Sequence, residues 1–215
     1  PYCKVCPVCN GAACKNQMPG PGAKGVGDNA VRNYQKWQEI RVNMDTISEN
    51  RPVDTSLSLF GKTFRYPFFA GPVGAVNLHY GEKYNDMEYN QILVKACSEN
   101  GIAAFTGDGT NPAVMEAASK AIAAEHGNGI PTIKPWNVDT LREKYELVKM
   151  SGSFAVAMDV DGAGLPFLKN LDSPAGSKTV EELRVIAKAV GVPFIVKGVM
   201  TVRGARKAQE AGAAA

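Results

Sequence analysis

Short apolar runs alternate with longer amphipathic stretches over most of the chain. The runs that predict buried strands cover residues 68–71, 103–106, 132–134, 154–159 and 194–196. Helical spacing of apolar positions predicts helices over residues 86–99, 112–124, 138–150, 180–190 and from about 201 to 212. Five strand-then-helix units predict an α/β fold with a parallel sheet, which is either doubly wound or closed into a barrel.

Local signals mark the ends of two of these helices. Thr179 and Glu182 have the spacing of a capping box, and Gly191 ends the same helix. Thr201 is the expected N-cap of the last helix, and Gly212 is its expected end.

The N-terminal part has a different pattern. Residues 16–29 are rich in Gly, Pro and Asn, which predicts a linker or a loop laid over another surface. Apolar positions in residues 29–44 have roughly helical spacing. Residues 53–67 alternate on both sides of Gly61, which predicts a β-hairpin.

Composition bounds the class of protein. The 215 residues are enough for one domain with a sizeable core, and a net charge of +3 argues against nucleic-acid or membrane partners. No apolar run approaches the length of a membrane span and no signal peptide is visible, so we expect a cytoplasmic location. Pro1 in place of Met indicates a missing or processed start. We divide the chain into an extension with its linker (1–28) and an α/β domain (29–215).

The extension carries a cluster of cysteines, Cys3, Cys6, Cys9 and Cys14. The pattern C-x2-C-x2-C-x4-C is a metal-ligand spacing, and four thiolates at this density suit Zn(II) or a [4Fe–4S] cluster. Reduced thiols and disulfides are the alternatives, of which a cytoplasmic location disfavours the second. The spacing does not choose between zinc and iron–sulfur.

Lys197 is the strongest single candidate for a functional residue. It ends the apolar run 194–196 and precedes Gly198 and the last helix. The carboxyl end of a buried parallel strand is where α/β folds bind their ligands. From spacing alone, an exposed lysine in an ordinary strand-to-helix turn is an equal alternative.

The surrounding residues carry a family resemblance. Residues 192–201, Val-Pro-Phe-Ile-Val-Lys-Gly-Val-Met-Thr, precede a helix that ends in Glu-Ala-Gly-Ala. This segment closely resembles the fifth-strand signature of the FMN-dependent α-hydroxy-acid oxidases and dehydrogenases. The resemblance spans residues 30–215 and implies a TIM (β/α)8 barrel, with the hairpin at its bottom. It also implies that Lys197 reaches the N1/C2=O edge of FMN and stabilises the anionic reduced ring.

Measured against this family, the chain resembles an N-terminal fragment with the first five βα units. The resemblance places the family's catalytic histidine beyond residue 215, and it places the last three βα units in further sequence or in another chain. The implied reaction is oxidation of a small 2-hydroxy acid with hydride transfer to flavin N5. The extension resembles that of a bacterial branch of α-hydroxy-acid oxidising proteins, and family members often form homo-oligomers.

Further residues take cofactor roles through the same resemblance. Pro72, Val73 and Gly74 match the first-strand segment, whose backbone runs against the flavin ring. Thr106 and Gly107 stand where relatives have serines, so Thr106 is expected to supply a hydroxyl.

The third and fourth strands supply the remaining matches. Lys134 stands where a glutamine binds the pyrimidine end of FMN, and Trp136 where a tyrosine touches substrate. Asp159 replaces a flavin-side threonine and is expected to form a charge network with Lys134 and Lys197. Residues 161–170 lack the arginine that holds the substrate carboxylate in relatives, which puts the hydroxy-acid substrate in doubt.

The two histidines have different expected roles. His79 follows the first strand, which places it on the catalytic face of a barrel as a candidate substrate contact. His126 stands at a helix exit and is interpreted as a solvated C-terminal histidine.

Two other functions remain open. One is a different FMN-barrel reaction, such as that of type 2 isopentenyl-diphosphate isomerases, which Lys134 favours because diphosphates need basic groups. The other is a non-catalytic fragment or split subunit, which the missing histidine segment favours.

Overall fold

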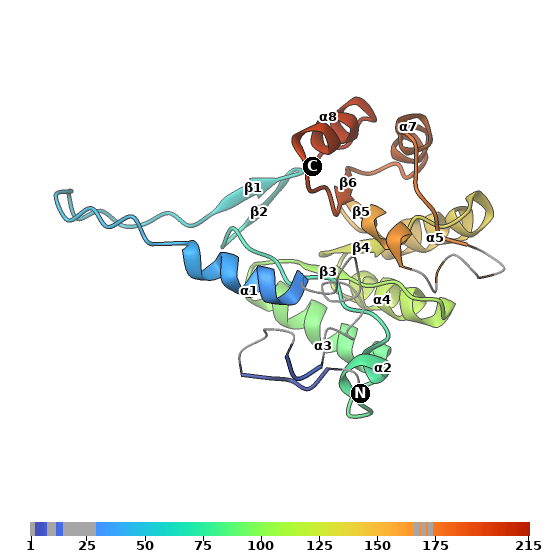
Figure 1. Ribbon diagram of the computed structural model, residues 1–215, viewed down its shortest axis with the longest axis horizontal. Helices are drawn as coiled ribbons and strands as arrows, with labels where there is room; N and C mark the ends of the chain where they lie inside the picture. Colours follow the sequence, from blue (N-terminus) through green and yellow to red (C-terminus); the bar gives the residue numbers. More distant parts are fainter. Residues whose placement is uncertain (1–2, 8–11, 15–28, 166–167, 169–170, 172–173) are drawn as a thin grey trace.

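A four-stranded parallel sheet forms the centre of the protein (Figure 1). The computed structural model describes residues 3–7, 12–14, 29–165, 168, 171 and 174–215. The strands, in sheet order, are β3 (Ala104–Thr106), β4 (Gly129–Ile133), β5 (Val156–Asp159) and β6 (Phe194–Lys197). Sheet order follows chain order, as expected when each strand is joined to the next by a crossover helix. The α/β class is therefore confirmed.

Both edges of this sheet are continued by short backbone contacts. Ala70 forms a parallel bridge with Ala104, and its carbonyl oxygen accepts from the Phe105 N–H at 2.9 Å. The expected first strand is thus in its expected place, although it is reduced to a bridge. At the other edge, the Ala214 N–H donates to the Phe194 carbonyl at 2.7 Å, and the Val196 N–H donates to the carbonyl of Ala215 at 2.9 Å.

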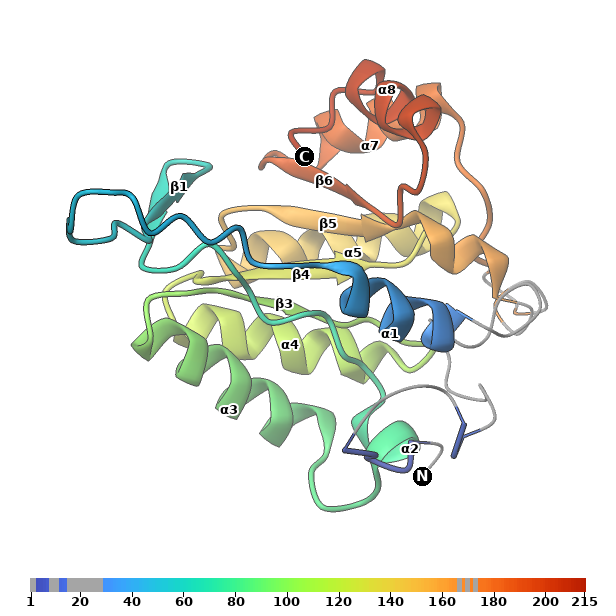
Figure 2. The same cartoon turned by 60° about the vertical axis from the view of Figure 1, so that its left-hand side comes forward.

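Helices cover one face of the sheet. Their bounds are α3 (Asp86–Glu99), α4 (Pro112–Ala124), α5 (Val138–Ser151), α7 (Val180–Ala189) and α8 (Val202–Glu210). Figure 2 shows β3 to β6 side by side, with α4 and α5 behind them and α1 (Asn29–Glu39) in front. The expected helices are confirmed to within a few residues.

Strand alternation divides the buried side chains between two faces. On the helix-facing side, Ile133, Met158 and Val196 belong to the largest core cluster, together with Leu141 and Leu183. On the opposite, inner face, Ile130 and Ala157 pack with the partly buried Phe105 and Ile195. Because successive strand residues point to opposite faces, Asp159 and Lys197 lie on the inner face with Ala157 and Ile195.

The hairpin consists of β1 (Leu57–Leu59) and β2 (Lys62–Phe64), and it is confirmed as antiparallel. Phe60 and Gly61 both have positive φ, 51° and 77°, as a type I′ turn requires. Phe60 packs on the inner face, and the ring of Phe64 lies 5.6 Å from that of Phe154, which precedes β5. The hairpin therefore lies at the amino end of the strands, opposite Lys197.

Two features differ from the sequence expectation. The helix expected over residues 29–44 ends at Glu39, and Val42 and Met44 beyond its end are exposed. The short helices α2 (Val76–Tyr80) and η1 (Val160–Gly164) have too few residues to show a periodic pattern. No helix within the described ranges is both long and apolar enough to cross a membrane.

The expected caps are present. The Thr179 side chain accepts from the Glu182 N–H while the Glu182 carboxylate accepts from the Thr179 N–H, which completes a capping box at α7. Thr201 Oγ1 accepts from the Gly204 N–H at 3.0 Å and caps α8. These caps fix where α7 and α8 begin and therefore how the loops before them leave the sheet.

Candidate functional site

Lys197 and Asp159 face each other at the carboxyl end of the sheet. They are the last residues of β6 and β5, and the parallel register pairs them directly. Lys197 Nζ lies 2.7 Å from Asp159 Oδ1. Since both side chains lie on the inner face, the strand register itself produces this ion pair.

Two further charged side chains complete the cluster. Lys134, the residue after β4, places Nζ 3.8 Å from Asp159 Oδ2. Asp161, in η1, places Oδ1 3.8 Å from Lys197 Nζ. The network expected from the sequence therefore forms, and Asp161 is an additional member. Two lysines and two aspartates, from four consecutive elements, meet at one end of the inner face.

Asp159 is the least solvated carboxyl of this cluster, with a side chain 20% exposed. Burial raises its pKa above the ordinary value, and the neighbouring carboxyl of Asp161 raises the pKa further. The contact with Lys197 acts in the opposite direction but does not cancel these effects. The carboxyl is therefore easier to protonate than an ordinary aspartate.

The segment Pro72–Gly74, predicted to run against the flavin ring, lies in close contact with the loop after β3. A Cβ placed on Gly107 would lie 2.4 Å from the carbonyl carbon of Val73 and 2.5 Å from the Gly74 nitrogen. A Cβ on Gly74 would lie 2.9 Å from the carbonyl oxygen of Asp108. Pro72–Gly74 and the loop after β3 thus meet backbone to backbone, which only glycine permits at this distance.

Asp108 holds the same loop to its neighbours. Its carboxylate accepts from Trp136 Nε1 at 2.6 Å, from Lys144 Nζ at 2.8 Å and from the Lys134 N–H at 3.2 Å. The side chain is 1% exposed, so the Lys144 contact is a buried ion pair. Asp108 is a structural anchor for the strand end that carries Lys134, rather than a group open to a flavin or a substrate.

Trp136 and Thr106 are not brought to the charge cluster. Trp136 is 3% exposed, packs in the helix-side core and donates its indole N–H to Asp108. Thr106 shares a strand face with Ala104, which packs against α3 and α4. The structure therefore gives no support to a substrate contact by Trp136 or to a hydroxyl from Thr106 at the flavin.

His79 lies in α2 at the same end of the sheet as Lys134. Burial lowers its pKa, the Asp86 carboxylate raises it, and the positive charge of Lys134 lowers it. Its carbonyl oxygen accepts from the Cys3 N–H at 2.9 Å. His79 is thus within electrostatic range of Lys134, Cys3 of the extension contacts the same helix, and the role of His79 as a substrate contact stays a prediction.

The metal site remains a prediction. Cys9 lies outside the described residues, while Cys3 and Cys6 carry free thiols. Among the residues that are described, no three His, Cys, Asp or Glu side chains gather as metal ligands. Cys97 belongs to the core cluster between α3 and β3, where burial raises its pKa.

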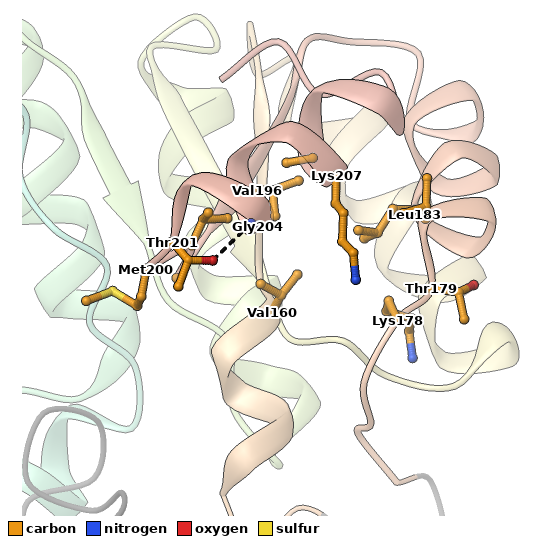
Figure 3. Close-up of a pocket in the computed structure, with 13 residues that line it drawn as sticks. Val160, Lys178, Thr179, Leu183, Val196, Met200, Thr201, Gly204 and Lys207 are labelled. Carbon is orange, nitrogen blue, oxygen red and sulfur yellow. Dashed lines mark hydrogen bonds between the residues drawn. The ribbon is translucent and has the colours of Figure 1, made fainter.

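A cavity of about 390 Å³ lies between α7, α8 and the end of β6 (Figure 3). Lys178 and Lys207 extend toward the same part of it. The residues described along its lining include none of Lys134, Asp159 and Lys197. The cavity is a gap between helices on the outer side of the sheet and is separate from the charge cluster.

Comparison with known proteins identifies the class. The family model for FMN-dependent dehydrogenases matches residues 21–166, which is more than half of the chain. The chain therefore belongs to the FMN-dependent dehydrogenase family. No curated protein matches it.

Solved structures agree on the fold. A putative lactate oxidase from Pediococcus acidilactici is 17% identical with a TM-score of 0.64, over 84% of this chain and 54% of that one. A mandelate oxidase variant with (S)-mandelic acid is 19% identical with a TM-score of 0.66, over 93% of this chain and 63% of that one. A flavocytochrome b2 variant with pyruvate bound is 17% identical with a TM-score of 0.59, over 79% of this chain and 46% of that one. The fold is thus that of a TIM barrel, of which this chain spans about half to two thirds and which the described strands do not close.

Sequence reasoning missed the Lys144–Asp108 pair, although one signal was present. Lys144 lies between Leu141 and Val148 in helical spacing, so it occupies the core-facing side of α5. A lysine at a core position predicts a buried carboxylate partner, because an unpaired buried charge is strongly unfavourable. The sequence does not show which aspartate pairs with Lys144, because the contact joins residues that are 36 positions apart.

We predict that Gly107→Ala destabilises the protein by about 1–3 kcal/mol, because the new methyl group overlaps the Val73 backbone. Gly71→Ala is the matched control, since a Cβ at that position meets nothing within 4 Å. Urea denaturation of both variants measures the difference. Equal stability of the two variants would contradict the close contact between the loops.

We predict that Lys144→Met lowers the free energy of unfolding by about 3–5 kcal/mol, because it leaves Asp108 buried without its cation. Lys149→Met is the control on the same helix; it removes an exposed ion pair with Glu146 and is expected to cost about 0–1 kcal/mol. Chemical denaturation compares the two. A loss for Lys144→Met no larger than that of the control would show that Asp108 does not depend on this pair.

Proposed function

We propose that this chain forms the FMN-binding part of an oxidoreductase that oxidises a small 2-hydroxy acid. The observation that carries the proposal is the placement of Lys197 on the inner face at the carboxyl end of β6, with Lys134 and Asp159 beside it. Ligands of TIM-barrel enzymes bind at this end of the strands. Family membership supports FMN as the cofactor of the assembled protein.

The residues present fit the pyrimidine end of a flavin. That end of the ring offers carbonyl oxygens and a ring nitrogen that accept, together with an N–H that donates. Lys134 and Lys197 supply cationic donors, and Asp159 supplies an acceptor, all from adjacent strands. The glycines at positions 74 and 107 let the loops after the first strand and after β3 pack backbone to backbone, and the proposal places the flavin ring beside this pair of loops.

Each of these residues has a definite role in the proposal. When bound, FMN supplies the redox chemistry, by accepting two electrons and a proton from substrate. Lys197 places positive charge where the reduced ring becomes negative, and Lys134 binds the same end of the ring. Asp159 orients Lys197 through their ion pair. The proposal assigns the proton acceptor for the substrate hydroxyl to sequence beyond residue 215.

The substrate class in the proposal rests on structural neighbours that include a putative lactate oxidase and a mandelate oxidase with (S)-mandelic acid. Residues 161–170 contain no arginine, so the proposal assigns the substrate carboxylate to a group outside this segment. A cytoplasmic location and a homo-oligomeric state belong to the proposal as expectations from the sequence and the family.

We predict that Lys197→Met raises the Kd for FMN at least about tenfold, a loss of roughly 1.4 kcal/mol, because the flavin loses its cation. Lys197→Arg keeps the charge and is expected to restore part of the affinity. Lys207→Met is a control, since this lysine lines the cavity outside the sheet. Fluorescence titration with FMN gives the Kd of the wild-type protein and of each variant. A protein that binds no FMN, or a Lys197→Met variant that binds it as well as the control, contradicts the proposal.

The cysteine-rich extension is proposed to hold a structural Zn(II) or a [4Fe–4S] cluster. Anaerobically purified protein is expected to contain either about one zinc or about four iron atoms per chain. Cys6→Ser is expected to lower the bound metal, whereas Cys97→Ser, in the core between α3 and β3, leaves the content unchanged. Elemental analysis of the three proteins decides the matter. Wild-type protein without either metal contradicts the assignment.

A further inference from the structure

Asp159 stands at the centre of a charge cluster that is balanced when every group is ionised. The titratable groups that face it in the described part of the chain are Lys134, Lys197 and Asp161, with His79 reaching the cluster through the charge of Lys134. Two lysines and two aspartates sum to zero net charge. A site that stabilises an anion needs net positive charge, so full ionisation leaves this cluster poorly matched to a negative ligand.

The two aspartates meet at one cation, Lys197. Burial and the neighbouring carboxyl of Asp161 both raise the pKa of Asp159, so this carboxyl takes up a proton more readily than an ordinary aspartate. Gly198 makes the approach possible: a Cβ there would lie 2.5 Å from Asp161 Oδ1. The chain after β6 therefore leaves room for this carboxyl, and the pair is built into the fold.

Lys197 is held by Asp159 in this structure. Its amino group lies 2.7 Å from Asp159 Oδ1 and 3.8 Å from Asp161 Oδ1. A lysine paired in this way stabilises an anionic ring only weakly, because the negative charge of its partner cancels most of its electrostatic field. Protonation of Asp159 removes that cancellation without moving any backbone.

We infer that Asp159 is a proton acceptor coupled to reduction of the flavin, and that it releases the charge of Lys197 when negative charge arrives at that end of the site. The inference rests on the proposed FMN function and concerns this chain's own carboxyl. Asp161, whose side chain is 40% exposed, connects Asp159 to solvent.

The step balances in charge and in protons. Substrate delivers a hydride, which is two electrons and one proton, and this leaves one additional negative charge on the ring. Asp159 takes a second proton from solvent through Asp161, forming an O–H bond and breaking its ion pair with Lys197. Lys197 then neutralises the ring. The total uptake is two electrons and two protons, one of them held by the protein.

The test counts protons from the pH dependence of the midpoint potential. The FMN-loaded protein is titrated with a chemical reductant without oxygen, from about pH 5 to pH 9, because a carboxyl whose pKa is raised by burial titrates above its ordinary range. Wild-type protein is expected to take up two protons per two electrons over part of this range, whereas Asp159→Asn is expected to take up one. The slope of the midpoint potential against pH is therefore expected to be half as steep in the variant. The absorption spectrum of the reduced flavin is expected to be that of the anionic form in both proteins.

Asp161→Asn supplies an independent test, because it leaves Asp159 able to titrate. Loss of the neighbouring carboxyl is expected to lower the pKa of Asp159 and to move the two-proton range to lower pH. One proton throughout in wild type, two protons in Asp159→Asn, or a neutral reduced flavin in wild type each overturns the inference while FMN binding stands. Protein that binds no FMN overturns the proposed function together with the inference.

Discussion

The Asp108 carboxylate fixes the carboxyl end of the sheet, and the candidate site depends on it. It joins the loop after β3, the strand end of β4 and helix α5 through one buried group that accepts from the Trp136 ring, from Lys144 and from the backbone of Lys134. A buried carboxylate with this many donors is stable only as a complete set, because losing one donor leaves the charge uncompensated. The arrangement therefore holds Lys134 in register with Asp159.

The charge cluster on the inner face follows from strand register. Parallel pairing of β5 with β6 sets Asp159 opposite Lys197, and alternation turns both toward the inside of the sheet. The same alternation sends Met158 and Val196 toward the helices, where they form the core. One geometric rule thus separates the residues that stabilise the fold from those that can meet a ligand. The proposed roles of Lys197 and Asp159 both derive from that separation.

The sequence predicts the elements well because their signals are local. The bounds of α3 and α4 agree with the expectation because apolar periodicity and the residues that begin and end each helix are visible in the chain. The placement of Lys197 follows from strand and loop order alone. The roles of Asp108 and Asp161 were harder to predict, because each role depends on side chains from other elements. For Trp136 the family resemblance was misleading. It predicts a side chain that is exposed to substrate, whereas the indole is buried and donates its N–H to Asp108.

The central claim is that Lys197 meets the flavin from the inner face of the sheet. A crystal structure of the FMN-loaded protein tests this most directly. The account predicts Lys197 Nζ within hydrogen-bond distance of the flavin N1 or C2=O oxygen, about 2.7–3.2 Å, with Lys134 at the same end of the ring. A flavin bound elsewhere, for example in the cavity between α7 and α8, with the Lys197–Asp159 pair away from the ring, would contradict the account.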